Sequence, residues 1–225
     1  GEGDIYDYYG REAIFAVIGF QSMEYEYSGY ALFCDGDDFD FAVLSFADAD
    51  SAEFLNDYLL SALDSFAVSP GLMLNPGPVS RYYLESFDAP KRAAAETLFE
   101  GSTVKWQIDM NEVEASQLVI EREAAILTDY KPETEAGKEA WQRFYRLIYR
   151  DSYSRLNYFA SLMTEKLKDG REAPDSETDS REAVPGRLLA WLQGFEYIRT
   201  WGTSDLVSPL TAAAAGQGDC DTRAL

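Results

Sequence analysis

Cys220 is the residue of this sequence whose setting points most clearly to chemistry. It lies in the run Gly-Gln-Gly-Asp-Cys-Asp-Thr-Arg-Ala at 216–224. This run predicts that one helix ends at Gly216 and that a new helix begins around Asp219. A cysteine at a helix N-terminus faces unpaired N–H groups and the positive end of the helix dipole, and both favour the nucleophilic thiolate. The sequence therefore predicts a reactive thiol at position 220.

Histidine is absent from all 225 residues. Its absence removes the usual general base and the commonest metal ligand of proteins. The only other cysteine, Cys34, lies in an apolar run at 27–34, and two cysteines do not make a disulfide framework. Cys34 is therefore predicted to be a buried free thiol.

Helices are predicted around the cysteine. After the dipeptide at 131–132 the spacing of apolar residues changes from a period of two to a period of 3.6. The predicted elements are a long helix at 135–167, a polar loop at 169–180, a helix at 185–200 with Pro185 in its first turn, and a short helix at 209–215. The helix at 185–200 is expected to end near residues 201–202.

Residues 1–130 are predicted to form a mixed α/β domain. The segments 11–20, 27–34 and 40–46 are rich in β-branched and aromatic residues and predict three strands, with a hairpin turn at 35–36. A helix is predicted over 51–66, with Asp50 and Glu53 forming its capping box.

The segments after this helix are predicted from weaker patterns. They are a loop at 68–79, a strand at 80–87, a helix at 89–100 capped by Asp88, and a half-buried strand at 103–110. The segment 113–127 fits a strand or a helix equally well.

The order of features in the C-terminal part resembles that of the transglutaminase-like superfamily. Its members carry a helix with Gln and Tyr, then a loop, a proline-containing turn and a Gly-x-Gly-Asp-Cys motif. Here the matching segments are 192–197 (Leu-Gln-Gly-Phe-Glu-Tyr), 208–212 (Ser-Pro-Leu-Thr-Ala) and 216–224. The likeness extends over about 135–225 and is sharpest from 188 onward.

The resemblance implies a papain-like α+β fold in which a cysteine attacks an amide carbonyl of a protein or peptide. The resulting thioester is resolved by water or by an amine, so the parent protein would be a cysteine peptidase or an acyltransferase. Cys220 takes the position of the nucleophile. The family's base, a histidine on a later strand oriented by an aspartate, has no counterpart in this chain.

The chain alone is therefore expected to be inactive. Its predicted organisation is an N-terminal α+β accessory domain at 1–130 and the helical first half of a truncated transglutaminase-like domain at 131–225. The alternative is a non-catalytic binding or scaffolding module on the same fold.

Several polar residues near Cys220 are candidates for supporting roles. The backbone N–H of Cys220 and the side chain of Gln193 are candidate oxyanion donors, with Asp219 as a further supporting residue. Asp219 and Asp221 are also calcium candidates, as in one bacterial branch of the family, but a threonine replaces the third acid and helix capping is the favoured role. No other cofactor is expected. Arg223 is expected to pair with one of these acids.

The charge of the chain limits its partners. A net charge of −21 argues against nucleic acid, and no apolar run approaches the roughly 20 residues of a membrane span. Fourteen acids and a single base lie in residues 1–60, which favours a solubilising surface in a secreted, periplasmic or cell-surface protein over acidic mimicry of nucleic acid. The arginines at 143, 146 and 150 are expected to pair with surface acids.

Overall fold

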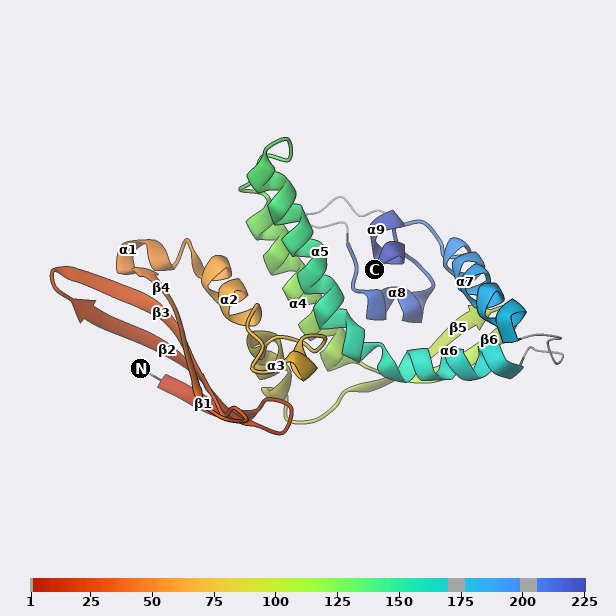
Figure 1. Cartoon of the computed structure of the whole chain (residues 1–225), viewed down its shortest axis with the longest axis horizontal. Coiled ribbons are helices and arrows are strands. Elements are labelled where there is room, and N and C mark those ends of the chain that lie inside the picture. Colours follow the sequence, from red (N-terminus) through yellow and green to blue (C-terminus); the bar gives the residue numbers. More distant parts are fainter. Residues whose placement is uncertain (1, 170–176, 199–205) are drawn as a thin grey trace.

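The computed structural model describes residues 2–169, 177–198 and 206–225. An N-terminal four-stranded antiparallel sheet is followed by a helical region that contains a small β-hairpin (Figure 1). The chain is therefore α+β, as the sequence predicts. Within the described residues, every helix is too short or too polar to cross a membrane.

The N-terminal sheet is a meander in which each strand pairs with the next. Its strands are β1 (Glu2–Asp7), β2 (Glu12–Ser22), β3 (Tyr25–Cys34) and β4 (Phe41–Asp48). The three predicted strands are confirmed as β2, β3 and β4. Strand β1 is not apparent from the sequence, because its six residues include three acids and a glycine, which are depleted in strands.

One face of this sheet packs on the helices α2 (Asn56–Asp64) and α3 (Pro78–Glu85). The resulting core contains Phe15, Leu32 and Leu63, together with the thiol of Cys34, which is buried and free as predicted. Burial raises the pKa of the Cys34 thiol.

The predicted helix at 51–66 is interrupted. It consists of α1 (Ala49–Ala52) and α2, and residues 53–55 form a turn between them. The side chain that caps α1 is Asp48, which accepts a hydrogen bond from the Asp50 N–H, so the capping box of Asp50 and Glu53 is wrong. Phe54 points into solvent, and the apolar stripe of the predicted helix is therefore not continuous.

Two further segments differ in secondary structure from the prediction, one being a helix instead of a strand and the other a strand instead of a helix. Residues 80–87 lie mostly in α3, and 89–100 contain the strand β5 (Arg92–Phe99). Pro78 starts α3 because its fixed φ suits the first helical turn. The alanines of β5 favour a helix, but pairing with β6 (Ser102–Asp109) and burial of every second residue override this preference.

Strand β6 confirms the predicted alternation, since Val104, Trp106 and Ile108 are buried. Glu100 and Gly101 both have positive φ and form the tight turn between β5 and β6. The hairpin packs on the helices α6 (Asn157–Asp169) and α8 (Pro209–Ala215), and Trp106 contacts Phe159 in this core.

The helical region extends from the N-terminal sheet to the hairpin (Figure 1). Its helices are α4 (Met110–Leu127), α5 (Glu135–Arg155), α6 (Asn157–Asp169), α7 (Glu177–Gln193), α8 (Pro209–Ala215) and α9 (Cys220–Ala224). The predicted helix at 135–167 is thus two helices, because α5 packs on α4 whereas α6 turns at Leu156 to cover the hairpin (Figure 1).

Helix α7 occupies a different range from the predicted helix at 185–200. It begins at Glu177, so Pro185 lies inside it and the predicted polar loop at 169–180 is partly helical. It ends at Gln193 rather than near residues 201–202, which lie outside the described residues.

The predicted domain boundary near residue 131 lies in the connection between α4 and α5. Packing crosses this connection, since Ile120 and Ala124 of α4 contact Phe144 and Ile148 of α5. The division into two domains stays a prediction.

Candidate thiol site

Local signals in the sequence place Cys220 at the start of a helix. The hydroxyl of Ser208 caps α8, and Gly216 ends α8 with a left-handed φ of 64°. The Asp219 carboxylate then accepts a hydrogen bond from the Thr222 N–H at 2.8 Å and caps α9. The predictions of a helix at 209–215 and of a helix start at Cys220 are both confirmed.

The thiol of Cys220 is exposed and free. It is a hydrogen-bond donor to Asp221 Oδ1, with an S···O distance of 3.5 Å. The N–H of Cys220 has no acceptor within its own helix, because it belongs to the first turn. The site thus presents an accessible sulfur, an N–H donor and a carboxylate at the sulfur.

The segment after α7 is joined directly to the segment that precedes Cys220. The Glu196 N–H donates to the Gly216 carbonyl at 2.9 Å, and the Gly218 N–H donates to the Glu196 carbonyl at 3.0 Å. These bonds form a short parallel bridge between Glu196 and Gln217. Two parts of the sequence motif, 192–197 and 216–224, are therefore held together in space.

Arg223 strengthens this junction. Its guanidinium donates to the carbonyls of Gly218 and Phe195, at 3.1 and 2.8 Å, and lies 5.7 Å from the centre of the Tyr197 ring. The expectation that Arg223 pairs with Asp219 or Asp221 is wrong. Buried carbonyls at the bridge offer it two acceptors, whereas Asp219 is occupied by the helix cap.

The other predicted supporting residues have different positions relative to the sulfur. Gln193 is exposed at the end of α7, and within the described residues no hydrogen bond joins it to Cys220. Asp219 is buried as the cap of α9, which is the role favoured for it.

The predicted calcium site at Asp219 and Asp221 has no third protein ligand. In the part of the chain that the structure describes, no three or more acidic or cysteine side chains are arranged to hold a metal ion. Two carboxylates alone do not meet the six to eight oxygen ligands that calcium takes.

Tyr145 is a neighbour of the site that the sequence did not reveal. Burial raises the pKa of Tyr145 to about 12, and its hydrogen bond with Asp221 contributes to the same shift. The negative charge of Asp219 adds to it. Tyr145 of α5 therefore lies beside Asp221. From its spacing Tyr145 belongs to the apolar face of α5, and only the packing of α9 against that face indicates its second contact.

An apolar cavity of about 370 Å³ lies beside α9, between α6, α7 and α8. Phe159, Trp191 and Phe195 line it, together with Thr222 and Ala224 from α9. The cavity is suited to an apolar group on a ligand that contacts the helix of Cys220.

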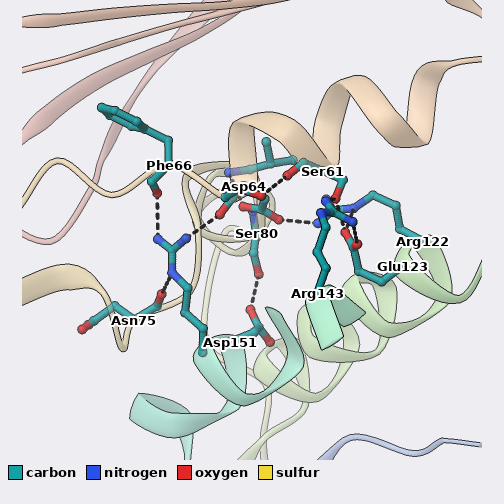
Figure 2. A network of polar contacts seen from close by, with 12 residues as sticks. Ser61, Asp64, Phe66, Asn75, Ser80, Arg122, Glu123, Arg143 and Asp151 are labelled. Atoms are coloured by element: carbon teal, nitrogen blue, oxygen red, sulfur yellow. Dashed lines mark hydrogen bonds and ion pairs between the residues drawn. The ribbon is translucent and has the colours of Figure 1, made fainter. Parts of the chain in front are cut away.

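A second concentration of functional groups is buried between α2, α3, α4 and α5 (Figure 2). Figure 2 shows Arg122 and Arg143 converging on the carboxylate of Glu123, which also accepts a hydrogen bond from Ser61. The Asp64 carboxylate binds Arg122 at 2.6 Å and accepts hydrogen bonds from the N–H groups at the start of α3.

Arg143 and Arg150 of α5 serve this buried network rather than the surface. Arg143 binds the buried Glu123 at 2.7 Å, and Arg150 donates to the carbonyls of Asp64, Phe66 and Asn75. The expectation that these residues pair with surface acids is wrong for both. Arg146 donates to the backbone carbonyl of Gln142 on its own helix.

Asp151 of α5 forms a further part of the network. Its carboxylate accepts hydrogen bonds from Ser80 at 2.8 Å and from Arg155 at 3.0 Å, and Arg155 also binds Glu112. Burial raises the pKa of Asp151 to about 7 and lowers the pKa of Arg155 to about 10. Since each charged group in the network has partners, it is a structural connection between helices rather than a reactive site.

Comparison of the chain with protein-family models, curated proteins and solved structures finds no match.

Proposed function

We propose that this chain carries the nucleophile of a transglutaminase-like thiol site acting on a protein or peptide. In this reaction Cys220 Sγ loses its proton and attacks an amide carbonyl, and the C–N bond breaks as the amine leaves with a proton. A thioester remains on Cys220, and water or a second amine resolves it. The chain would accordingly belong to a cysteine peptidase or an amide acyltransferase.

The observation that carries the proposal is the position of Cys220. Its exposed thiol is on the first residue of α9, directly after the capping Asp219, and the bridge at Glu196 brings the Gln193–Tyr197 region against this turn. The N–H of Cys220 supports the proposal as an oxyanion donor, because it lies on the residue whose sulfur would bind the carbonyl carbon.

The proton acceptor has to come from elsewhere, because the 225 residues contain no histidine. Asp221 is the only acid bonded to the sulfur among the described residues, and it accepts the S–H hydrogen bond at an S···O distance of 3.5 Å. An imidazole supplied by further residues or by another molecule would provide the base that the reaction needs.

Alkylation by iodoacetamide tests whether the thiol is activated. The intact chain is labelled at neutral pH, and each cysteine is followed by mass spectrometry after digestion. Cys220 is expected to react at least about tenfold faster than glutathione under the same conditions. Glutathione is the necessary reference, because exposure alone would make Cys220 faster than the buried Cys34.

Acyl transfer is tested with p-nitrophenyl acetate, with imidazole added to the buffer as the base. The expected product is an acetyl thioester on Cys220, retained in Cys34→Ser and lost in Cys220→Ser. A thiol that reacts no faster than glutathione and forms no thioester would contradict the proposal.

The second candidate is a non-catalytic binding module on the same fold. The contact between Cys220 Sγ and Asp221 favours it, because the S–H proton of Cys220 is held in a hydrogen bond to a carboxylate. Asp221→Asn distinguishes the two candidates. If the site is a nucleophile restrained by Asp221, this substitution increases the alkylation rate of Cys220, whereas an inert thiol stays at the rate of glutathione.

A further inference from the structure

The N-terminal sheet has a second face, opposite to α2 and α3, which we call the outer face. Two rows of residues that pair across neighbouring strands make up most of it. The first row is Ile5, Ile14, Phe33 and Ala42, and the second is Ala16, Ala31 and Leu44. Phe46 belongs to the next row along β4. Residues directly opposite one another in a sheet point to the same side. None of these positions is charged, so the outer face is apolar across all four strands.

Large apolar side chains on the outer face are open to solvent. Ile5, Leu44, Phe33 and Phe46 are 68, 53, 44 and 43% exposed. Between them lies Ala31, and Gly29 on the same strand is paired with Phe46. On the outer face, large exposed side chains therefore surround small residues. Apolar surface of this extent is uncommon on an isolated soluble domain and marks interaction sites.

The outer face continues into an acidic hollow at one end. A cavity of about 340 Å³ is lined by Glu12, Asp35 and Asp40, and its floor includes Ile14 and Phe33 of the outer face. The Asp35 N–H donates to the Glu12 carbonyl, which extends the β2–β3 ladder as far as these acids.

Within the N-terminal sheet, no base forms an ion pair with the carboxylates of Glu12, Asp35 or Asp40. Arg11 is the single base of residues 1–60, and its side chain is bound to Asp37 and to the carbonyl of Asp35. In the described residues, no group of three acids here or elsewhere is arranged to hold a metal ion. The hollow is therefore suited to an organic cation, such as a lysine or arginine side chain.

We propose that the outer face is the docking surface for a basic amphipathic segment of another protein. The apolar side chains of this segment would cover Phe33, Leu44 and Phe46, and a lysine or arginine would enter the hollow between Glu12, Asp35 and Asp40.

Charge complementarity decides between this partner and other occupants. A second copy of the chain would bring a further net charge of −21 and another acidic hollow to the same contact. An anionic membrane surface would be repelled for the same reason. In Figure 1, α4 and α5 stand between the N-terminal sheet and α9, so this surface is separate from the thiol site.

The test uses the intact chain and three synthetic peptides. The peptides have the same length and the same spacing of leucines, and their polar positions are all lysine, all serine or all glutamate. Binding is measured by fluorescence anisotropy. The lysine peptide is expected to bind most tightly, and Leu44→Ser is expected to weaken it by about tenfold or more. Asp40→Asn and Glu12→Gln are expected to weaken the lysine peptide, more strongly at low salt, and to leave the serine peptide unchanged.

Matched controls lie on other surfaces of the chain. Leu98→Ser removes an apolar side chain of similar exposure from β5, and Glu133→Gln removes an exposed acid from the α4–α5 connection. Both are expected to bind the lysine peptide like the unaltered chain. Because all substituted residues are exposed, circular dichroism should show the same fold for every variant.

Four outcomes would overturn the proposal. The first is equal binding of the three peptides. The second is an equal loss of lysine-peptide binding in the outer-face variants and the control variants. The third is a concentration-dependent dimer in sedimentation velocity that Leu44→Ser abolishes, which would make a second copy the occupant. The fourth is binding to phosphatidylcholine–phosphatidylserine vesicles that Leu44→Ser abolishes, which would make the outer face a membrane contact.

Discussion

At the scale of single residues, Asp151 has an unusual electrostatic environment for a carboxyl group. Asp151 is almost fully buried, and burial raises the pKa of its carboxyl to about 7, with the negative charge of Asp64 acting in the same direction. In an unfolded chain the same carboxyl titrates near pH 4. Folding therefore changes the number of protons that the chain binds between about pH 4 and pH 7.

The sign of this linkage gives a prediction for Asp151→Asn. Between about pH 4 and pH 7 the folded state holds a proton on Asp151 that the unfolded state releases, so the contribution of Asp151 to stability falls as pH rises. The asparagine variant cannot titrate. The unfolding free energy of the unaltered chain minus that of Asp151→Asn should therefore decrease as pH is raised from about 4 to about 7 in urea titrations.

Asp88→Asn provides the control for this measurement, because Asp88 is exposed between α3 and β5. It removes an exposed carboxylate instead of a buried one, so a pH trend that both variants share does not come from the burial of Asp151. A constant difference for Asp151→Asn would show that Asp151 keeps its charge throughout.

At the scale of secondary-structure elements, the thiol site depends on the short turn between α8 and α9. This turn requires a left-handed residue at Gly216 and a cap at Asp219, and the bridge to Glu196 holds it against the end of α7. Since α9 has only five residues, its position depends on these contacts more than on its own helical stability.

Substitutions of Gly216 test the turn. Gly216 has a φ of 64°, and a Cβ built there meets no atom within 4 Å, so Gly216→Ala carries a purely conformational cost of about 1 kcal/mol. Gly216→Asn is expected to cost less, because asparagine tolerates the left-handed region better. Thermal unfolding would measure the stability of both variants. Equal losses of stability would show that the cost does not come from the left-handed backbone conformation.

At the scale of the whole molecule, the buried polar network connects elements that are distant in sequence. Glu123 of α4 binds Ser61 of α2 and Arg143 of α5, and Asp64 of α2 binds the start of α3. The backbone before α3 lies close to the Asp64 carboxylate, and a Cβ at Gly77 would collide with this carboxylate. The network thus connects the helices that support the N-terminal sheet with the helices that lead to the thiol site.

Removing the charge of Glu123 should destabilise the whole chain. In Glu123→Gln the buried guanidinium of Arg122 and that of Arg143 lose a partner, and the expected loss is about 3 kcal/mol of unfolding free energy. Glu121→Gln is the matched control, since Glu121 is exposed on the same helix, and it should change stability by less than about 0.5 kcal/mol. Similar losses for the two variants would show that the network contributes little.

The sequence by itself was sufficient for the ends of α8 and α9 and for β6, where short-range chemistry decides the structure. Pro209, Gly216 and Asp219 set the ends of α8 and α9 through backbone preference and capping, which act within a few residues, and so Cys220 was placed correctly at a helix start. The alternation in β6 was readable for the same reason, since it depends only on which residues face the core.

Only the tertiary structure decided the elements and contacts that depend on distant partners. The alanine-rich β5 is a strand because β6 pairs with it, and residues 80–85 are helical although their sequence alone suggested a strand. The partners of Arg143 and Arg150 lie 20 to 86 positions away in the chain, and Tyr145 meets Asp221 only after α9 packs on α5. The physical reason is that burial and long-range hydrogen bonds exist only once the helices have assembled, whereas caps, turns and periodicity act within one short segment.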